Sequence, residues 1–405
     1  MKKCGLLGKK LGHSYSPAIH AKLGNYEYLL YEKTEEELED FVKNGKWDGL
    51  NVTIPYKKML LPLCDELSET ARKMGSVNTM VRKADGKIFG DNTDAPGFSA
   101  LIRHSGIEVN RKKVLVLGSG GASAAVCAAL QETDARITII SRRGPDSYEN
   151  IGKHSDADVI VNTTPVGMYP DNLNSPLDLG VFSSLKGVLD VVYNPARTGI
   201  LLQAEERGIP YANGLYMLVA QAKRSSELFT GEKIPEETVE KITAELEASM
   251  QNIILIGMPG CGKTTVARRL AGRLGRPLCD SDVQIEEMSG MKIPEIFERF
   301  GEDGFRRRET EALSQLGKAS GTVISTGGGC VTREENYAFL HQNGRIFWIC
   351  RDISRLARKG RPLSAGNLDE MYSIREPLYK RFADFRIDNN GTLEETLEQI
   401  LYRLQ

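Results

Sequence analysis

One short motif constrains the fold of this 405-residue chain more than any other feature. Residues 257–264 read Gly-Met-Pro-Gly-Cys-Gly-Lys-Thr, which matches the pattern GxxxxGK[ST]. The apolar run IILIG leads into the motif, and a helical pattern from Thr265 to Leu274 follows it. Glycines in this order let backbone N–H groups close around a phosphate, and the following helix adds the positive end of its dipole. The sequence therefore predicts a buried strand, a phosphate-binding loop and a helix.

Two side chains of this motif carry the chemistry of nucleotide binding. Lys263 is expected to reach the β- and γ-phosphates of ATP, and the Thr264 hydroxyl is expected to ligate Mg²⁺. A glycine-rich turn without a ligand is the alternative, which the strand before and the helix after disfavour. The residues expected to bind ATP in this loop are Gly260, Cys261, Gly262, Lys263, Thr264 and Thr265.

An acidic pair, Asp280 and Asp282, follows the next apolar residues. Two carboxylates at positions i and i+2 after a strand can face one site, with one toward a metal ion and the other toward a hydroxyl nucleophile. A turn or a helix cap is the alternative for such a pair taken alone. Downstream of a phosphate loop, the pair favours phosphoryl transfer to a hydroxyl group.

Four further segments follow in order toward the C-terminus. They are GEDGFRRRE at 301–309, three glycines at 327–329, RKGRPL at 358–363 and REPLY at 375–379. The basic cluster alone could be a solvated helix face or a nucleic-acid patch, although its acidic neighbours disfavour the latter. Together with the phosphate loop and the acidic pair, these segments resemble shikimate kinase over nearly all of residues 252–405.

The resemblance implies roles around the transferred phosphoryl group. Asp280 would join Thr264 in the Mg²⁺ shell, and Asp282 would orient or deprotonate the attacking ring hydroxyl. Lys263 would complete this catalytic group. Phosphoryl transfer depends on positioning and charge neutralisation rather than on covalent help, which agrees with these residue types.

The resemblance also implies a carboxylate-binding end and a lid. Arg306 and Arg375 would hold the substrate carboxylate with the Gly328 backbone, which suits the forked geometry of guanidinium groups. Arg361 would be the catalytic lid arginine and an ATP contact, and Arg358 would contact the adenine side. The segment between these two arginines is shorter than in the usual lid.

A second glycine-rich loop follows the buried-strand pattern KVLVLG and opens an Ala-rich helix. It reads Gly-Ser-Gly-Gly-Ala-Ser at residues 118–123, with Ser123 at the third glycine position of GxGxxG. The flanking strand and helix favour a dinucleotide site, and a tight βα turn is the alternative. The residues expected from this pattern to bind the cofactor are Gly118, Gly120, Gly121 and Ala122 in the loop and Ser141, Arg142 and Arg143 after the next strand.

The choice of cofactor depends on the end of the next strand. Arg142 and Arg143 stand there, where an acidic residue would hold the ribose of NAD. Arginines at this place can bind the 2′-phosphate of NADP, so NADP(H) is the expected cofactor. Ordinary solvated surface is the alternative for the two arginines, and Asp146 nearby leaves NAD open.

Seven clusters before residue 246 resemble shikimate dehydrogenase and cover most of residues 2–245. They are GHSYSPAIH at 12–20, NVTIPYK at 51–57, VNT at 77–79, GDNTD at 90–94, NTTPVGM at 162–168, DVVYNP at 190–195 and the helical pattern 214–221. The resemblance implies that the substrate carboxylate is bound by Ser14 and Ser16. It implies that the ring hydroxyls are bound by Asn51, Thr53, Asn78 and Gln221, with Lys57 and Asp94 as the catalytic pair. It also implies that Tyr193 and Gly214 bind the cofactor.

Physical chemistry supports Lys57 and Asp94 in this role. Hydride delivery to a ketone leaves an alkoxide that must gain a proton. A lysine ammonium can stabilise and protonate this oxygen, and a neighbouring carboxylate can fix the orientation of the lysine. Taken singly, Lys57 could be a surface lysine and Asp94 a helix cap.

Composition disfavours several other classes of protein. The formal net charge of −1 gives no bulk attraction to nucleic acid or to an anionic membrane. The seven cysteines never form a CxxC pair, and no apolar run reaches membrane-spanning length. These features favour a cytoplasmic chain with reduced thiols and no zinc site. Small molecules are the expected partners; no protein partner is required, and the oligomeric state stays open.

The predicted fold class is α/β throughout. A shikimate-dehydrogenase-like two-domain α/β part with a Rossmann-type cofactor domain would precede a P-loop kinase domain with a parallel sheet. The substrate domain would comprise residues 1–100 plus 215–248, the cofactor domain 101–214 and the kinase domain 250–405. The join at 247–251 contains no Gly/Pro-rich linker, so little flexibility is expected there.

The expected function is two consecutive reactions. The first is the reversible NADPH-dependent reduction of 3-dehydroshikimate to shikimate, and the second is the ATP- and Mg²⁺-dependent phosphorylation of shikimate to shikimate 3-phosphate. One alternative makes the N-terminal part a broader NAD-dependent quinate/shikimate dehydrogenase. Another makes one half a non-catalytic regulatory module, and a nucleic-acid-dependent NTPase is disfavoured by charge.

Overall fold

The computed structural model describes residues 1–12, 14–356 and 368–404. Its contacts divide the chain into two compact units. The first unit comprises Met1–Gly167, Asn174–Tyr193 and Gln203–Glu245, and the second comprises Met168–Leu173, Asn194–Leu202 and Leu246–Gln405. Within the described ranges, no helix has both the length and the apolar character needed to span a membrane.

The first sheet of the first unit is mixed and has the strand order β2-β1-β3-β5-β6-β4. Strand β1 is parallel to β2 and β3, whereas β5 is antiparallel to both β3 and β6. The hairpin between β5 and β6 turns at Asp85-Gly86 as predicted, because Gly86 adopts a φ of +86° that glycine tolerates. The strands are β1 (Lys3–Gly8), β2 (Glu27–Glu32), β3 (Gly49–Val52), β4 (Glu66–Leu67), β5 (Thr79–Arg82) and β6 (Ile88–Asp91).

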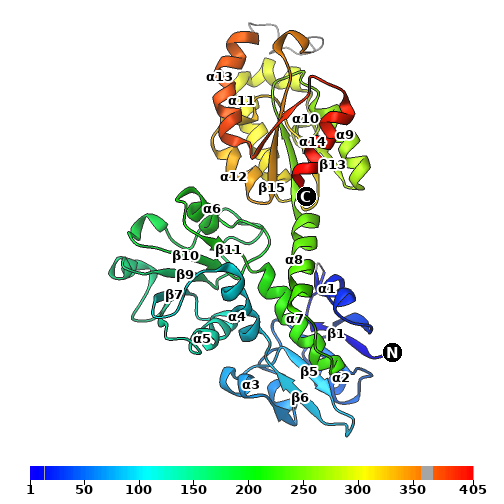
Figure 1. The fold of residues 1–405 in the computed structure, drawn as a ribbon, viewed down its shortest axis with the longest axis vertical. Helices are drawn as coiled ribbons and strands as arrows, with labels where there is room; N and C mark the ends of the chain where they lie inside the picture. Colours follow the sequence, from blue (N-terminus) through cyan, green and yellow to red (C-terminus); the bar gives the residue numbers. More distant parts are fainter. Residues whose placement is uncertain (13, 357–367, 405) are drawn as a thin grey trace. The chain divides into compact units, whose positions relative to one another are not determined.

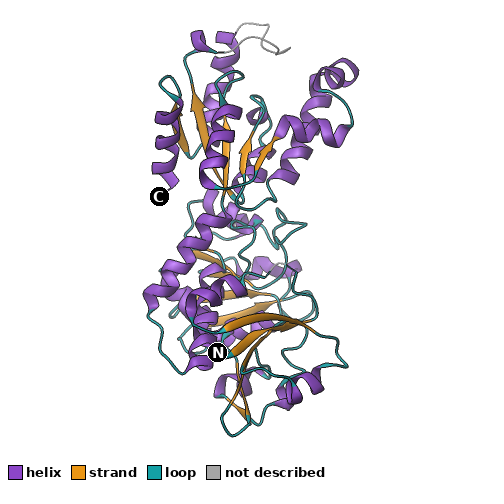
Figure 2. Cartoon of the chain, turned by 90° about the vertical axis from the view of Figure 1, so that its right-hand side faces the viewer, coloured by secondary structure: helices purple, strands orange, loops and turns teal. Residues whose placement is uncertain are grey.

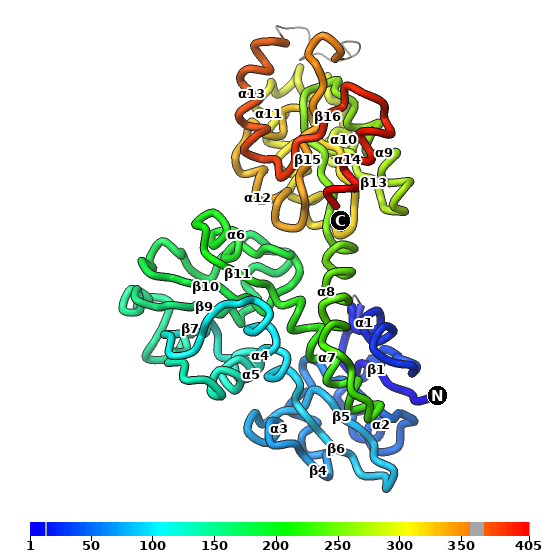
Figure 3. The backbone as a smooth tube through the Cα atoms, viewed as in Figure 1, coloured from blue at the N-terminus to red at the C-terminus, as the bar shows by residue number. Residues whose placement is uncertain are grey.

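Helix α7 (Leu215–Thr230) returns to this sheet from far along the chain, and Figure 3 shows it in green beside the blue N-terminal segments. Gly97 permits close packing of α4 against α7, since a Cβ at Gly97 would lie 2.9 Å from Cβ of Gln221. The helical elements of this lobe are α1 (Ser16–Leu23), α2 (Leu38–Asn44), the 3₁₀ turn η1 (Leu61–Leu63), α3 (Glu69–Met74), α4 (Asp94–Ser105), α7 and α8 (Glu236–Met250).

The second sheet of the first unit is parallel throughout and has the order β11-β10-β9-β7-β8. Its central strands are buried apolar runs, as expected when helices cover both faces of a parallel sheet. The predicted Rossmann-type strand–loop–helix unit is present as β7 and α5. The elements are β7 (Lys113–Leu117), α5 (Gly121–Leu130), β8 (Arg136–Ile140), η2 (Tyr148–His154), β9 (Val159–Asn162), η3 (Leu179–Val181), β10 (Gly187–Asp190), α6 (Gly199–Glu206) and β11 (Tyr211–Ala212).

The second unit is built around a parallel sheet with the order β13-β14-β12-β15-β16. Figures 1 and 2 show these strands with helices on both sides. Buried aliphatic residues of β12, β14 and β15 form the centre of its core. The elements are β12 (Asn252–Ile256), α9 (Lys263–Leu274), β13 (Leu278–Asp280), α10 (Ser281–Ser289), α11 (Ile293–Leu316), β14 (Val323–Ser325), η4 (Cys330–Thr332), α12 (Glu335–His341), β15 (Gly344–Cys350), η5 (Ile353–Arg355), α13 (Leu368–Phe382), β16 (Phe385–Asp388) and α14 (Leu393–Leu404).

Two candidate active sites

The predicted phosphate loop connects β12 to α9 in the second unit. Gly257, Gly260 and Gly262 have φ angles of 144°, 84° and 102°, in the region that favours glycine. Lys263 begins α9 and is only 8 % exposed. Its Nζ donates hydrogen bonds to the carbonyl oxygens of Gly257 (2.8 Å) and Met258 (3.1 Å). The ammonium therefore lies across the loop, where it is placed to neutralise bound phosphate.

Asp280 uses its two carboxylate oxygens in different ways. Oδ1 accepts the backbone N–H of Asp282 (3.0 Å) and caps α10, whereas Oδ2 accepts the Thr264 hydroxyl at 3.2 Å. The helix cap and the predicted metal ligand are thus compatible roles of one side chain. Hydroxyl and carboxylate oxygens are the hard donors that Mg²⁺ prefers, so Thr264 and Asp280 fit a magnesium site.

Two arginines mark the other end of the site. Arg306 is 6 % exposed and donates from Nη1 to Glu309 at 2.7 Å, while Arg375 donates from Nη1 to the Gly328 carbonyl at 3.3 Å. Tyr379 donates to the same carbonyl. Glu309 is fully buried; burial raises the pKa of its carboxyl, and Arg306 partly offsets this effect. The arginine side chains are therefore held in place by buried groups.

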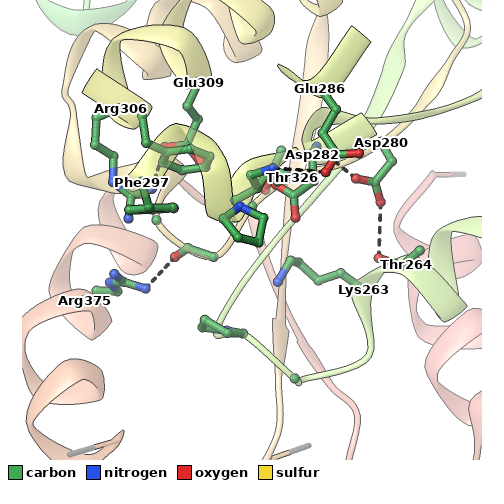
Figure 4. A pocket seen from close by; sticks show the side chains of 18 of the residues that line it. Lys263, Thr264, Asp280, Asp282, Glu286, Phe297, Arg306, Glu309, Thr326 and Arg375 are labelled. Carbon is green, nitrogen blue, oxygen red and sulfur yellow. Dashed lines mark hydrogen bonds and ion pairs between the residues drawn. The ribbon is translucent and has the colours of Figure 1, made fainter. Parts of the chain in front are cut away.

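These groups line one cavity of about 450 Å³, and Figure 4 shows them from close by. Lys263, Thr264 and Asp282 lie toward one side, and Arg306 and Arg375 lie toward the other. Such a cavity can hold a small acid with its carboxylate at the arginines and a hydroxyl near Asp282. The apolar part of the wall is formed by Ile293, Pro294, Phe297 and Phe305. The predicted lid residues Arg358 and Arg361 lie outside the described residues.

The predicted pair Lys57 and Asp94 is in direct contact in the first unit. Lys57 Nζ lies 2.6 Å from Asp94 Oδ2, and Asn78 Nδ2 donates to Asp94 Oδ1 at 2.8 Å. Asp94 is the first residue of α4, and its backbone N–H bonds the Asn92 side chain. The sequence placed these residues at 57, 78 and 94, and the fold brings their side chains together.

A hydrogen-bond network connects Asn51 to Gln221 through Ser225 and Thr93. Asn51 is 6 % exposed; its Oδ1 accepts the Tyr28 hydroxyl (2.8 Å), and its Nδ2 donates to Ser225 Oγ (2.8 Å). Thr93 Oγ1 donates to Gln221 Oε1 at 3.2 Å and lies 3.3 Å from Ser225 Oγ. Both ends of the Asn51 amide therefore have hydrogen-bond partners within this network, and Gln221 is joined to the network through Thr93.

The predicted carboxylate-binding serines lie where the chain enters α1, in a stretch that we call the serine loop: Ser14 precedes the helix, and Ser16 is its first residue. Ser14 Oγ accepts the backbone N–H of Ser16 at 3.2 Å, and both residues are partly exposed. Thr53 is partly exposed at the end of β3. Tyr193 packs edge-on against Tyr15, with ring centroids 6.0 Å apart. The residue predicted to bind cofactor therefore also lies beside the serine loop.

The dinucleotide loop joins β7 to α5 as predicted. Gly118 has a φ of +106°, and a Cβ at Gly120 or Gly121 would meet open space, so the backbone there is accessible to a ligand. At Gly214 a Cβ would lie 2.1 Å from the Val191 carbonyl oxygen, so this turn requires glycine for packing. The backbone N–H groups of this βα turn are therefore accessible to the phosphates of a dinucleotide.

The turn after β8 exposes Arg142 and Arg143, as a 2′-phosphate site would need. Ser141 Oγ donates to the Arg143 carbonyl and shapes this turn. Asp146, which left NAD open, bonds His154 Nε2 at 2.8 Å. The two exposed guanidinium groups make this turn suitable for a phosphate.

Sequence reasoning missed two residues that shape these sites. Glu309 follows Arg306 by three positions on α11, and Ser225 follows Gln221 by four positions on α7. Residues three and four apart share one face of a helix, so this spacing was an available signal. The partner of Glu309 is Arg306 on the same helix, whereas Ser225 contacts Asn51, which comes from a distant segment and leaves no local pattern.

Two separate nucleotide-binding folds, each with its own predicted catalytic residues, indicate a bifunctional enzyme in which a dehydrogenase precedes a kinase. Family profiles match in the same order: shikimate dehydrogenase substrate binding domain at 6–80, shikimate 5′-dehydrogenase C-terminal domain at 214–242, and shikimate kinase at 259–405. A shikimate dehydrogenase (NADP(+)) of Clostridium perfringens (strain SM101 / Type A) is 34% identical over 269 residues, covering 61% of this chain and 99% of that protein. The chain belongs to the shikimate dehydrogenase family and continues into a shikimate kinase domain.

Solved structures resemble the dehydrogenase part. Shikimate 5-dehydrogenase of Thermus thermophilus, in complex with NADP(H) and shikimate, is 31% identical with a TM-score of 0.56 and covers 60% of this chain and 99% of its own. Quinate dehydrogenase of Corynebacterium glutamicum, in complex with NAD, is 28% identical with a TM-score of 0.55 and covers 60% and 98%. The fold and the dehydrogenase class are thereby confirmed.

Proposed function

We propose that this chain reduces 3-dehydroshikimate to shikimate with NADPH and then phosphorylates shikimate at its 3-hydroxyl with ATP. The observation that carries the proposal is the kinase cavity, where Arg306 and Arg375 lie opposite Lys263 and Asp282. This arrangement suits a small ring that carries both a carboxylate and hydroxyl groups. The product of the first reaction has these features.

In the dehydrogenase site, bound NADPH supplies the hydride that reduces the ketone carbon. Lys57 stabilises the negative charge that develops on the ketone oxygen and donates the proton that completes the alcohol. Asp94 holds the Lys57 ammonium at 2.6 Å, and Asn78 fixes the other oxygen of that carboxylate. The serine loop and Gln221 would orient the acid so that its ketone faces Lys57.

In the kinase site, ATP with Mg²⁺ supplies the phosphoryl group. Asp282 orients the attacking hydroxyl and accepts its proton, while Lys263 neutralises charge on the phosphates. Thr264 and Asp280 would hold the metal ion. Arg306 and Arg375 fix the far end of the acid, so the hydroxyl reaches the phosphate in one orientation.

Incubation of the purified protein with 3-dehydroshikimate, NADPH, ATP and Mg²⁺ tests both reactions at once. Mass spectrometry should detect shikimate when ATP is omitted and shikimate phosphate when all components are present. Lys57→Ala should remove the first product, and Asp282→Asn should remove the second when shikimate is supplied. Absence of either product from the wild-type protein would reject the corresponding half of the proposal.

A second candidate is a dehydrogenase that also oxidises quinate with NAD. The similarity to the Corynebacterium glutamicum quinate dehydrogenase favours it. Arg142 and Arg143, with Asp146 held by His154, favour NADP instead. Initial rates with shikimate and NADP⁺ compared with quinate and NAD⁺ distinguish the two, because the first proposal predicts the higher rate for the first pair.

All seven cysteines are free thiols, which suits work in a reducing compartment such as the cytoplasm.

A further inference from the structure

A buried asparagine outside the predicted motifs contacts the phosphate loop. Asn389 follows β16 and is 7 % exposed. Its Nδ2 donates a hydrogen bond of 2.6 Å to the carbonyl oxygen of Cys261, inside the GxxxxGK[ST] motif. Its backbone N–H donates to the Cys350 carbonyl at 2.7 Å, so the main chain of this residue is fixed by the neighbouring strand.

The orientation of the Asn389 amide follows from its partners. The Cys261 carbonyl can only accept, so the amide must turn its NH₂ group toward the loop. Its Oδ1 then faces the hydroxyl of Thr396 on α14, which donates at 2.7 Å and is fully buried. A flipped amide would turn its oxygen toward the Cys261 carbonyl and lose that hydrogen bond, whereas the Thr396 hydroxyl can pair with either end of the amide.

The bond to Cys261 determines where the next N–H points. In a trans peptide, the carbonyl of one residue and the N–H of the next point in opposite directions. Holding the Cys261 carbonyl toward Asn389 therefore directs the Gly262 N–H away from Asn389. Gly262 has a φ of +102°, and a Cβ there would lie 2.7 Å from Asn389 Nδ2, so the contact also requires glycine.

We infer that Asn389 is a positioning residue for ATP, acting through the Cys261–Gly262 peptide. It holds the carbonyl away from the phosphate site and presents the Gly262 N–H to the phosphate, and Thr396 supports the amide by donating to its Oδ1. A peptide rotated the other way would direct a carbonyl oxygen at an anion. This inference rests on the proposed kinase function of the same loop.

Asn389→Asp tests the inference, because it preserves the shape of the side chain and removes the donor. The KM for ATP should rise about ten- to a hundredfold, as expected when a buried carbonyl loses its partner and a carboxylate takes its place. The KM for shikimate should change less than about twofold. Thr396→Val should shift the KM for ATP in the same direction by a smaller factor, about three- to tenfold.

Binding measurements separate this role from general damage. Calorimetric titration should show weaker tripolyphosphate binding in Asn389→Asp by the same factor as ATP, with adenosine binding unchanged. Asn336→Asp is the matched control, since Asn336 is also buried and donates to the Cys330 carbonyl at 2.7 Å. It should cost comparable stability without a selective loss of phosphate binding.

The outcomes distinguish the inference from the function on which it rests. Unchanged tripolyphosphate and ATP affinity in folded Asn389→Asp would overturn the inference, as would equal losses in Asn336→Asp. If Asn389→Asp does not fold, as judged by circular dichroism, Thr396→Val alone decides, and unaltered affinity there overturns the inference. A wild-type protein that binds tripolyphosphate but does not phosphorylate shikimate would instead refute the proposed kinase reaction.

Discussion

Both oxygens of Asp94 are engaged, one by the ammonium of Lys57 and the other by the amide of Asn78. An asparagine at this position would present its NH₂ group to one of two donors, so one contact would be lost. We therefore expect Asp94→Asn and Lys57→Ala each to lower kcat for ketone reduction by about 10²–10⁴-fold. NADPH affinity, measured by fluorescence titration, should persist because neither residue lies on the dinucleotide loop. A large loss of NADPH affinity would contradict the assignment.

Asp282 lines the cavity on the side of Lys263 and across from the arginines, so it can contact a hydroxyl that is directed toward the phosphate loop. Asp282→Asn should lower the kinase kcat by about 10²–10⁴-fold, since the amide cannot accept the hydroxyl proton. ATP affinity should stay nearly unchanged, and dehydrogenase turnover of the same preparation provides the internal control. Undiminished kinase turnover would remove Asp282 from the mechanism.

Arg142 and Arg143 are exposed at the turn where a 2′-phosphate would bind. A charge-assisted phosphate contact contributes about 1.5–3 kcal/mol, so wild-type kcat/KM should favour NADPH over NADH by roughly ten- to a hundredfold or more. Arg142→Ala should lower the ratio of kcat/KM for NADPH to kcat/KM for NADH, and it should leave kcat/KM for NADH nearly constant. A wild-type preference for NADH would show that the turn does not select the phosphate.

At the scale of the elements, helix α1 carries a histidine, His20, that makes the stability of the substrate lobe, the part of the first unit built on the mixed sheet, depend on pH. His20 is 1 % exposed and stacks on Tyr28 at 4.0 Å, and its Nδ1 lies 2.6 Å from the Tyr26 hydroxyl. Burial lowers the pKa of His20 from 6.5 to about 3. Below pH 6.5 the unfolded chain binds a proton that the folded chain excludes, so the stability contribution is complete above pH 6.5 and falls as pH decreases toward 3.

This coupling predicts that His20→Gln makes the substrate lobe less sensitive to acid. The wild-type free energy of unfolding should fall between about pH 6.5 and about pH 5 by about 1.4 kcal/mol per pH unit more than that of the variant. Urea unfolding at about pH 7 and about pH 5 can be followed by buried Trp47 in a Trp348→Phe background, since the chain contains two tryptophans. Parallel pH dependence in both proteins would contradict the prediction.

Local patterns predicted the elements that depend on neighbouring residues. The strand–loop–helix units at 252–274 and 113–130 and the hairpin at Asp85-Gly86 were predicted because glycine and apolar spacing determine them locally. The contact of Asn389 with Cys261 and that of Ser225 with Asn51 join segments more than a hundred residues apart. Such contacts depend on strand order and helix packing, which periodicity in a single sequence does not reveal.

At the scale of the whole molecule, α8 connects the two units. The sequence placed the join at 247–251, whereas α8 extends to Met250 and the contact division falls between Glu245 and Leu246. The end of this helix is held by the second unit: Arg276 donates to the carbonyls of Ala248 and Gln251, and the Met250 carbonyl accepts the Gly321 N–H at 2.7 Å. The hydrogen bonds of the last turn of α8 therefore assign this turn to the kinase unit.

This assignment leads to a prediction about separated halves. Each unit contains its own predicted nucleotide loop and predicted catalytic residues, so residues 1–245 and residues 246–405 should both be active when expressed alone. The fragment 246–405 should also melt several degrees above a fragment 250–405, because the shorter one loses the Ala248 carbonyl that Arg276 binds, as well as the buried side chain of Leu246. Both kinase fragments lack Met168–Leu173 and Asn194–Leu202 equally, so their comparison isolates the helix end. Melting curves by circular dichroism compare the stability of the two kinase fragments, and kinase and dehydrogenase assays measure the activity of each fragment. A fragment that is folded yet inactive would show that the fusion is required for catalysis.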